Sequence, residues 1–546
     1  MKSKYIMLSL LLMWASTITA QETYENTKLI DNDLNGTARY VGMGGALDAL
    51  GADISVISSN PAGIGMISKS RTDMSMGLVS QFNASDFKDC NTTNHSFNQI
   101  GFVFAMPNSF GSSFNLAVNY YKSRNFDYIL SATGKLNNAS QNTLSFLKSI
   151  YGEQKKQEPS NFYLEETNGI IRGTNRFTSQ LDNLYYNNLL VDANSSVAYN
   201  TAYNYTMNRA NTGYIGTYDV AMSGNINERI FLGGAFGFHS VHYSGYSEYT
   251  ENLMNATSKH VGSVTVFDER KITGLGVDFK LGLIFLPIEN SPFRMGVSIA
   301  TPTFYDLTTS NITSLKNLTN YKGKHQGWVS GESYNFKVFT PWKFGLSFGH
   351  TIGNYLALGA SYDYADYSNM VTRVNEGGTY DWYTGSYYES SSNDENMNNH
   401  TKQTLKGVST LKFGAELRPL SYISLRVGYN YVSPIFKTIG YKDGSIDSYG
   451  SNYSSSTDYI NWHSTHRYTF GFGVNMGKLN IDVAYQYSAQ SGDFHPFMDA
   501  YGDYYYYYFK NKATRQLTKE EIKNYADAVK VNNKRQQLLL TFGYRF

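Results

Sequence analysis

The sequence has very little cysteine and proline, and it lacks long apolar runs. One cysteine and ten prolines occur among 546 residues. A single thiol excludes an internal disulfide and a multi-cysteine metal site, so Cys90 is interpreted as an incidental thiol in a loop. Beyond residues 1–20 no run of about 18 apolar residues occurs, which excludes α-helical membrane spans.

The sequence also has no large excess of charge of either sign. The 46 basic and 44 acidic residues leave a net charge of +2, so nucleic acid is not an expected partner. No serine nucleophile elbow is present. Gly42-x-Gly44 does not continue into a dinucleotide-binding loop, because Leu47 stands where the third glycine would be. We therefore expect no enzymatic activity, no catalytic residue and no cofactor.

Two histidine pairs are candidate metal ligands. His239 and His242 lie three residues apart in a predicted strand, which puts their rings on opposite faces. His463 and His466 lie at a loop–strand junction and could contact a metal or haem, but no further ligand cluster accompanies them. Ordinary polar surface is the favoured interpretation, and no metal site is predicted.

Aromatic residues and glycine are abundant instead. Aromatics form 15% of the chain, with 47 tyrosines beside 48 glycines, and the mean hydropathy is -0.39. A transmembrane β-barrel has such a composition because it needs aromatic side chains at both membrane interfaces, a polar lumen and polar loops.

The amino terminus is typical of a secretory signal peptide. Lys2 and Lys4 precede a short apolar core, Tyr5 to Trp14, and cleavage is predicted after Ala20. Residues 1–20 are therefore assigned to the signal peptide. An exported chain with no helical span is expected in a bacterial outer membrane.

Alternation at period two dominates the chain from about residue 71. Residues 479–488, for example, place leucine, isoleucine, valine and two tyrosines on one face and mostly polar residues on the other. A soluble β-sandwich also alternates. Here the apolar faces become aromatic at their ends, while the opposite faces carry glycines and charges of both signs, which favours a barrel with a wet or plugged lumen. The charges expected in the lumen include Arg294, Lys343, Lys412, Glu416, Arg426 and Asp482.

The alternation predicts an all-β fold, a transmembrane antiparallel β-barrel of about fourteen strands formed by residues 71–546. Tight connections and long connections alternate between the strands, as periplasmic turns and extracellular loops do. The predicted strands are 72–82, 97–106, 112–123, 213–225, 229–242, 271–286, 292–301, 338–350, 355–367, 406–418, 421–432, 465–476, 478–489 and 535–546.

The last predicted strand ends in aromatic residues. Phe542, Tyr544 and Phe546 fall on one face. A carboxy-terminal aromatic that closes an alternating strand resembles the signal read by the outer-membrane assembly machinery. These three residues are therefore predicted to form the insertion signal, with that machinery and outer-membrane lipids as partners.

Two loop segments have distinctive compositions. Residues 503–509, DYYYYYF, are interpreted as an interfacial or exposed segment, with a ligand platform as the alternative. Residues 518–521, TKEE, are typical of a capping box and predict a short helix to about Lys530.

Residues 21–70 do not alternate. One helix is predicted around 45–50, ending at Gly51, and a second from Asp53 as its N-cap to just before Pro61. The many glycines imply tight turns and close backbone approaches. A compact hatch that plugs the lumen is the predicted structure.

The hatch segment resembles the amino-terminal hatch of the long-chain fatty acid transporter family, the FadL/TodX type of outer-membrane protein. The resemblance rests on Gly36-Thr37-Ala38-Arg39, Met43-Gly44-Gly45-Ala46 and Asn60-Pro61-Ala62, and it is close over residues 36–65. The site residues that it implies are Gly42, Gly44, Gly45, Asn60, Pro61 and Ala62.

The resemblance implies passive uptake of hydrophobic solutes, such as long-chain fatty acids or hydrocarbon-like molecules, by a monomer. In the family a ligand binds at the outer face, enters the barrel when the hatch shifts, and leaves sideways at an inward kink of the third strand. The third predicted strand, 112–123, contains no Gly or Pro to mark such a kink. A haem or small-solute channel remains an alternative, as does a surface adhesin or secretion-associated barrel that acts through its long loops.

Overall fold

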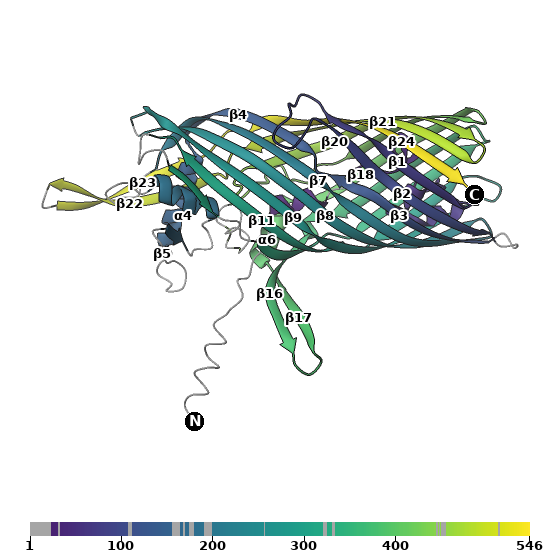
Figure 1. The fold of residues 1–546 in the computed structure, drawn as a ribbon, viewed down its shortest axis with the longest axis horizontal. Helices are drawn as coiled ribbons and strands as arrows, with labels where there is room; N and C mark the ends of the chain where they lie inside the picture. The colour runs from purple at the N-terminus through teal and green to yellow at the C-terminus, as the bar shows by residue number, and fades with distance from the viewer. Residues whose placement is uncertain are drawn as a thin grey trace.

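The chain forms a closed antiparallel β-barrel that encloses its own amino-terminal segment (Figure 1). The structure is a computed structural model. It describes residues 23–546 apart from 31–32, 108–111, 155–163, 168–169, 174–178, 191–198, 256, 320–324, 330–332, 444–445, 447, 449–454 and 512–513. The predicted signal peptide and the first residues of the predicted hatch, 21–22, lie outside the described residues.

In the described part of the chain, fourteen strands close the barrel, as the alternation predicts. Closure is made by β1 and β24, which pair from Arg71 with Arg545 to Gln81 with Arg535. The wall strands are β1 (Arg71–Gln81), β2 (Thr93–Pro107), β3 (Ser113–Asn125), β7 (Thr201–Ile226), β8 (Ile230–Met254), β9 (His260–Phe285), β10 (Arg294–Ala300), β14 (Lys343–Ile352), β15 (Leu356–Asp366), β18 (Gly407–Leu420), β19 (Ile423–Val432), β20 (Tyr459–Met476), β21 (Leu479–His495) and β24 (Val529–Arg545).

The strands form because their side chains alternate between an apolar exterior and a polar interior. On β21 the side chains of Asp482, Ala484 and Gln486 are buried in the lumen, while Tyr485 faces outward. Large apolar side chains stay exposed around the outside near the turn end, where short turns and the carboxy terminus lie, and we call this surface the apolar belt. Its members include Leu116, Val118, Val220, Met222, Leu232, Phe236, Leu281, Val297, Leu346, Phe413, Val427, Phe470, Leu538 and Phe542. An outward apolar band with polar contents is the arrangement of a membrane-spanning barrel.

Aromatic residues mark both edges of the apolar belt. Tyr355, Tyr422, Tyr544 and Phe546 are exposed at the turn end, and Tyr218, Trp342, Tyr364 and Tyr468 are exposed at the edge toward the loops. Such girdles lie at the two interfaces of a membrane because their rings are apolar and their polar groups remain wet.

Three wall strands are much longer than predicted. β7, β8 and β9 have 25 or 26 residues each, which is about 80 Å at ~3.3 Å per residue. This length exceeds the ~30 Å hydrocarbon core, so the outer halves of these strands continue above the apolar belt at the loop end. The sequence pattern predicted only their inner halves, because alternation fades where neither face meets lipid.

Further elements continue the wall toward the loop end or lie over it. Figure 1 shows α4 and the β22–β23 hairpin there, and a second hairpin, β16–β17, that projects sideways. The elements are β4 (Tyr128–Ala139), α4 (Gln141–Gln154), β5 (Leu164–Thr167), β6 (Ile170–Gly173), α5 (Gln180–Tyr185), η4 (Tyr186–Leu190), β11 (Phe304–Asn317), β12 (His325–Val329), β13 (Ser333–Phe339), η5 (Tyr367–Asn369), β16 (Val371–Asp381), β17 (Ser386–Asn393), α6 (Glu395–Thr404), β22 (Ala500–Asn511) and β23 (Thr514–Asn524). Buried side chains of α4 and α5, among them Phe146 and Tyr185, pack with Phe494 and Phe497 into an apolar cap.

The helix predicted from Thr518 to about Lys530 is wrong. Thr518 lies in β23, where it pairs with Tyr506 of β22, and Lys530 lies in β24. The local capping signal is overridden because the segment completes a hairpin with the tyrosine-rich strand. The side chains of residues 503–509 lie outside the described residues, so the interpretation of that tract stays a prediction.

The hatch lies inside the barrel, as predicted, and consists of α2 (Thr23–Ile30), α3 (Ala38–Gly42), η1 (Ile54–Ser58) and η2 (Pro61–Met66). Asp53 is the N-cap of η1, as expected, and accepts from the backbone of Ser55. The helix predicted around 45–50 is wrong, because residues 43–50 form successive turns and α3 precedes them. Gly44 and Gly45 have φ of +63° and +79°, which right-handed helix geometry does not allow. In the described part of the chain no helix is long and apolar enough to cross a membrane.

The apolar belt predicts how a charged side chain that faces lipid changes the stability of the barrel. Val220 faces outward from β7 within the belt and is 50% exposed. We expect Val220→Arg to lower the free energy of unfolding in lipid vesicles by about 2–4 kcal/mol, because the arginine would meet hydrocarbon.

Thr206→Arg is the matched control, since Thr206 faces outward from the same strand beyond the belt. Unfolding curves in denaturant measure both variants. Equal stability of the two arginine variants would contradict the assignment of the belt to the membrane.

Candidate functional site

The candidate site is the hatch together with the cavities that border it inside the barrel. The Gly-Thr-Ala-Arg sequence begins its tightly packed part. Gly36 has a φ of +147°, and a Cβ there would lie 2.6 Å from Ser55 Oγ. Thr37 is the N-cap of α3, and its hydroxyl donates to Asp53 at 2.9 Å. The amide of Ala38 donates to Thr541 Oγ1 on β24 at 2.7 Å, so each residue of the motif fixes a different contact.

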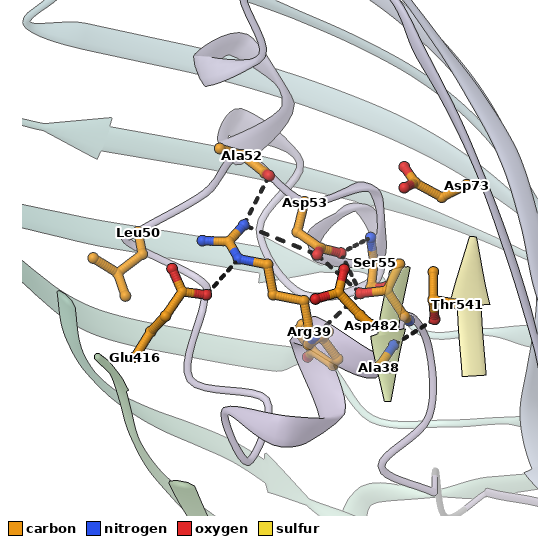
Figure 2. Close-up of polar contacts among 12 residues, drawn as sticks. Ala38, Arg39, Leu50, Ala52, Asp53, Ser55, Asp73, Glu416, Asp482 and Thr541 are labelled. Carbon is orange, nitrogen blue, oxygen red and sulfur yellow. Dashed lines mark hydrogen bonds and ion pairs between the residues drawn. The ribbon is translucent and has the colours of Figure 1, made fainter. Parts of the chain in front are cut away.

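Arg39 joins the hatch to the barrel wall through a buried charge network, which Figure 2 shows. Its Nε donates to Glu416 Oε2 at 3.0 Å, and a terminal nitrogen donates to the carbonyl of Ala52 at 2.9 Å. Glu416 also accepts from Arg426 at 2.7 Å, and Arg426 in turn donates to Asp482 at 2.6 Å. Glu416, Arg426 and Asp482 were predicted from the sequence as lumenal charges, and the structure brings them together around Arg39. Removing one partner of a buried network such as this costs about 3–5 kcal/mol.

The Met-Gly-Gly-Ala turn lies against a row of wall glycines. Gly349, Gly359, Gly414 and Gly428 are successive partners across β14, β15, β18 and β19. A Cβ at Gly359, Gly414 or Gly428 would overlap the backbone of Ala46, Met43 or Gly44, respectively. Gly42 packs in the same way on Gly471 of β20. Backbone therefore meets backbone over several strands, and the predicted residues Gly42 and Gly44 lie at this contact.

A second set of wall glycines lies on the facing wall, against Asn60, Pro61 and Ala62. We call both sets of wall glycines the glycine seats. The Asn60 side chain accepts from the amide of Ala62 at 3.2 Å and so caps η2, where Pro61 is the first residue. A Cβ at Gly233 of β8 would lie 2.5 Å from the Ala62 amide nitrogen and the Pro61 carbonyl carbon. Gly282 of β9 is in direct contact with Asn60. The triplet therefore begins η2 and places it on the wall at the same time.

The amino-terminal helix α2 lies nearer the loops and is held by different contacts. Glu25 pairs with Arg270 of β9 and with Lys28, both at 2.9 Å. Burial raises the pKa of Glu25, but Lys28, Arg270 and Lys442 outweigh burial and hold this pKa well below its ordinary value. The carboxylate therefore stabilises the docked helix above the ordinary pKa of a glutamate, and this stabilisation is lost only as the pH falls through the lowered pKa.

An upper cavity of about 160 Å³ lies between α2 and the outer parts of the wall. Its walls combine aromatic and aliphatic side chains with polar and charged ones in similar numbers. Tyr24 stacks on Phe436 at 4.9 Å between ring centroids, and Trp462 packs edge-on against Tyr128 at 5.8 Å. The lining includes Tyr24, Phe126, Tyr128, Leu130, Tyr243, Ile435, Phe436, Tyr459, Ile460, Trp462, Arg124, Arg209 and Arg535.

A lower cavity of about 190 Å³ lies beside the hatch, against the linker formed by residues 33–35. It is lined by Asp33, Leu34 and Asn35 of that linker and by charged wall residues, including Asp363 and Lys412. It shares Tyr367, Val408 and Val432 with the upper cavity. It also reaches Phe344 and Tyr364, whose side chains face outward in the apolar belt.

The wall beside the lower cavity is interrupted, whereas the third strand is continuous. β3 pairs with β2 and β7, with one register shift between Lys122 and Arg124. At the lower cavity, Pro302 separates β10 from β11 and Pro341 separates β13 from β14. The 3-10 helix η5 interrupts β15 and β16 at the same level. The interruption of the wall therefore lies at these strands.

The histidine pairs do not converge. His239 donates to or accepts from Asp278 and Thr217, both at 3.0 Å, inside the wall, and His242 is exposed on the other face, as predicted. His463 contacts Asp493 at 3.0 Å beside the upper cavity, whereas His466 contacts Tyr429 at 2.8 Å.

The carboxy-terminal aromatics lie on the outside of the barrel. Phe542, Tyr544 and Phe546 are 40%, 42% and 58% exposed. The backbone amide of Phe546 donates to the carbonyl of Ser70 at 2.9 Å, which places the chain end at the closing seam beside β1. Their role as an insertion signal stays a prediction.

The residues that line the upper cavity were not predicted. They come from α2, three loops and the outer halves of several strands, separated by up to 511 positions between Tyr24 and Arg535. The available signal was the repeated occurrence of aromatics where strands enter loops, such as Trp462 before the predicted strand 465–476. That signal does not tell which loops meet.

Comparisons with known proteins find similarity in the fold. No protein-family model and no curated protein sequence matches the chain. A Pseudomonas aeruginosa FadL homologue aligns at 12% identity and a TM-score of 0.48, over 94% of this chain and 99% of that one. The Ralstonia pickettii toluene transporter TbuX aligns at 11% identity and 0.45, over 94% and 99%. The Pseudomonas putida toluene transporter TodX aligns at 9% identity and 0.46, over 95% and 100%. These structures are of the type that the hatch segment resembles, and at these identities the similarity concerns the fold.

The glycine seats predict which wall residues hold the hatch. Gly233→Val places a side chain against Pro61 and Ala62, and overpacking of this kind costs about 1–3 kcal/mol. We expect the variant to insert but to loosen the hatch, and therefore to raise ion conductance in planar bilayers.

Gly234→Val is the matched control on the next residue. Its nearest atom is Leu281 Cδ2 at 3.5 Å, on the outward face. Conductance of this variant should equal that of the unmodified protein. If both variants conduct alike, the glycine seat does not retain the hatch.

Proposed function

We propose that this barrel is an outer-membrane transporter for the passive uptake of hydrophobic solutes of the long-chain acyl or hydrocarbon type. The observation that carries the proposal is the upper cavity, which lies between the outer loops and the hatch and has a cluster of aromatic and aliphatic side chains in its wall. The free energy of a small apolar molecule falls when it leaves water for such a cavity, by ~25 cal/mol per Å² of buried apolar surface. Direct passage through an open, water-filled pore is not required.

The charges around the upper cavity favour a solute with a polar end. Arg209 is paired with Asp458 at 2.7 Å, and Arg124 with Asp33 at 3.4 Å. Arg535 lines the cavity and forms no ion pair within 4.0 Å among the described residues. A carboxylate or hydroxyl head beside Arg535 would leave the apolar body against the aromatic rings.

A solute would occupy the two cavities one after the other on a single route. They share Tyr367, Val408 and Val432, and the linker 33–35 lines the lower one. Each is smaller than the ~300–1,000 Å³ of usual ligand pockets, so a long solute requires displacement of α2 or of the linker. The glycine seats and the Arg39 network hold the rest of the hatch, which favours movement of α2 and the linker over movement of the whole hatch.

The lower cavity supports release toward the membrane. It extends from the polar linker to Phe344 and Tyr364 at the loop-side edge of the apolar belt. The strands beside it are those interrupted at Pro302, Pro341 and η5. The sideways exit implied by the resemblance is therefore proposed at these strands, instead of at β3.

The route predicts a blocking substitution at Val432. Val432→Trp would fill the junction of the two cavities from the lumenal face of β19. We expect cells that carry this variant to lose uptake of a fluorescent long-chain acyl probe, because the probe cannot pass the junction.

Val427→Trp is the matched control on the same strand, since Val427 faces outward and is 49% exposed. It should take up the probe normally, and both variants should reach the membrane in equal amounts. Normal uptake through Val432→Trp would remove the two-cavity route. A steady open-channel conductance of the unmodified protein would favour the small-solute channel instead.

A further inference from the structure

The β16–β17 hairpin leaves the barrel sideways and has no place in the transport route. β16 pairs with β13 only from Val371 to Val374, and the hairpin beyond this pairs with itself. Figure 1 shows it projecting from the side of the barrel, with its tip inclined toward the turn end. A two-stranded hairpin that stands alone in water is marginally stable, so a contact at its tip would stabilise it.

The tip of the hairpin is aromatic and exposed. Trp382 and Tyr383 are 88% and 103% exposed, and Tyr380 is 46% exposed. Trp382 meets Tyr380 edge-on at 5.0 Å between ring centroids. Trp382 therefore keeps nearly all of its apolar surface outside the fold, where burial against another phase would stabilise it.

The position of the base of the hairpin indicates that the membrane is the phase against which Trp382 is buried. The outward-facing girdle residues Trp342 and Tyr364 lie close in sequence to the strands at its base, Trp342 between β13 and β14 and Tyr364 in β15. β16 begins at Val371, shortly after Tyr364 in the sequence, with η5 between them. The hairpin thus starts just above the loop-side edge of the apolar belt and inclines back toward it.

The chemistry of the tip fits the interfacial layer of a bilayer. Tryptophan and tyrosine concentrate at this layer because their rings are apolar while their N–H and O–H groups stay wet. The only basic residue of the hairpin, Arg373, lies at its base, where it contacts Ser391 and Asn393. Attraction of a phosphate to the tip through basic side chains is therefore not available, and the contact depends on the rings.

We propose that the β16–β17 hairpin inserts Trp382 and Tyr383 into the headgroup layer of the outer leaflet, as a membrane contact separate from the apolar belt. The hairpin would thereby connect this layer to η5, where Tyr367 lines both cavities. The proposal does not depend on the identity of the solute. A soluble protein that covers the same tip is the competing possibility, and the experiment below separates the two.

Tryptophan fluorescence tests the contact in the full-length protein. Replacing Trp328, Trp342 and Trp462 with phenylalanine leaves Trp382 as the reporter in the mature chain. The protein is placed in nanodiscs of phosphatidylcholine and phosphatidylglycerol, with or without lipids brominated near the carbonyl end of their chains. We expect blue-shifted emission, strong quenching by the brominated lipid and weak quenching by acrylamide.

The control moves the reporter away from the membrane. Trp382→Phe with Lys259→Trp places the tryptophan in the exposed turn between β8 and β9, at the loop end. This residue should be quenched by acrylamide and not by the brominated lipid. Heat-dependent electrophoretic mobility verifies that both proteins are folded barrels.

Two results would overturn the proposal. One is equal acrylamide quenching of the tryptophans at 382 and 259 with no effect of the brominated lipid. The other is protection of Trp382 that appears only after a soluble protein is added, again without quenching by lipid.

Discussion

Backbone amides and carbonyls that lie in hydrocarbon have no water to bind, and this constraint determines the rest of the structure. Every wall strand must be paired along both edges, so β24 must return to β1, and the pairing from Arg71 to Gln81 completes the wall. Closure forces each strand to present one face to lipid and one to the lumen. The lumenal face then collects the charges and glycines that lipid excludes, and these residues contact the hatch.

Two kinds of contact hold the hatch, and they act at different places. Wall glycines such as Gly233 and Gly428 let hatch backbone approach wall backbone, which fixes shape and position. The network of Arg39, Glu416 and Arg426 supplies charge contacts in a space that water does not reach freely. In contrast, α2 is docked through a few side chains above this level, and it borders the upper cavity. The part of the hatch that borders the upper cavity is therefore also the part with the fewest backbone contacts to the wall.

The sequence allowed the fold to be predicted well and the site only partly. Alternation identified all fourteen wall strands in their order, because each residue of a membrane-spanning strand must face either the lumen or the lipid. The loop-end extensions of β7 to β9 were missed, since that rule no longer applies above the belt. The Asn60-Pro61-Ala62 triplet and Gly42 were predicted as hatch site residues, and the structure gives the wall residues that they contact. Tyr24, Phe436 and Trp462 meet only through tertiary folding, so no local pattern could have placed them around one cavity.

The glycine seats also constrain the order in which the molecule is assembled. Hatch backbone is in van der Waals contact with strands on nearly opposite sides, from Gly233 on β8 to Gly471 on β20. Such a body cannot be threaded into a finished tube past the closely packed strands and the apolar cap. The hatch directly precedes β1 in the sequence, so it is available from the beginning while the wall forms around it. Sealing β24 onto β1 is then the step that encloses the hatch.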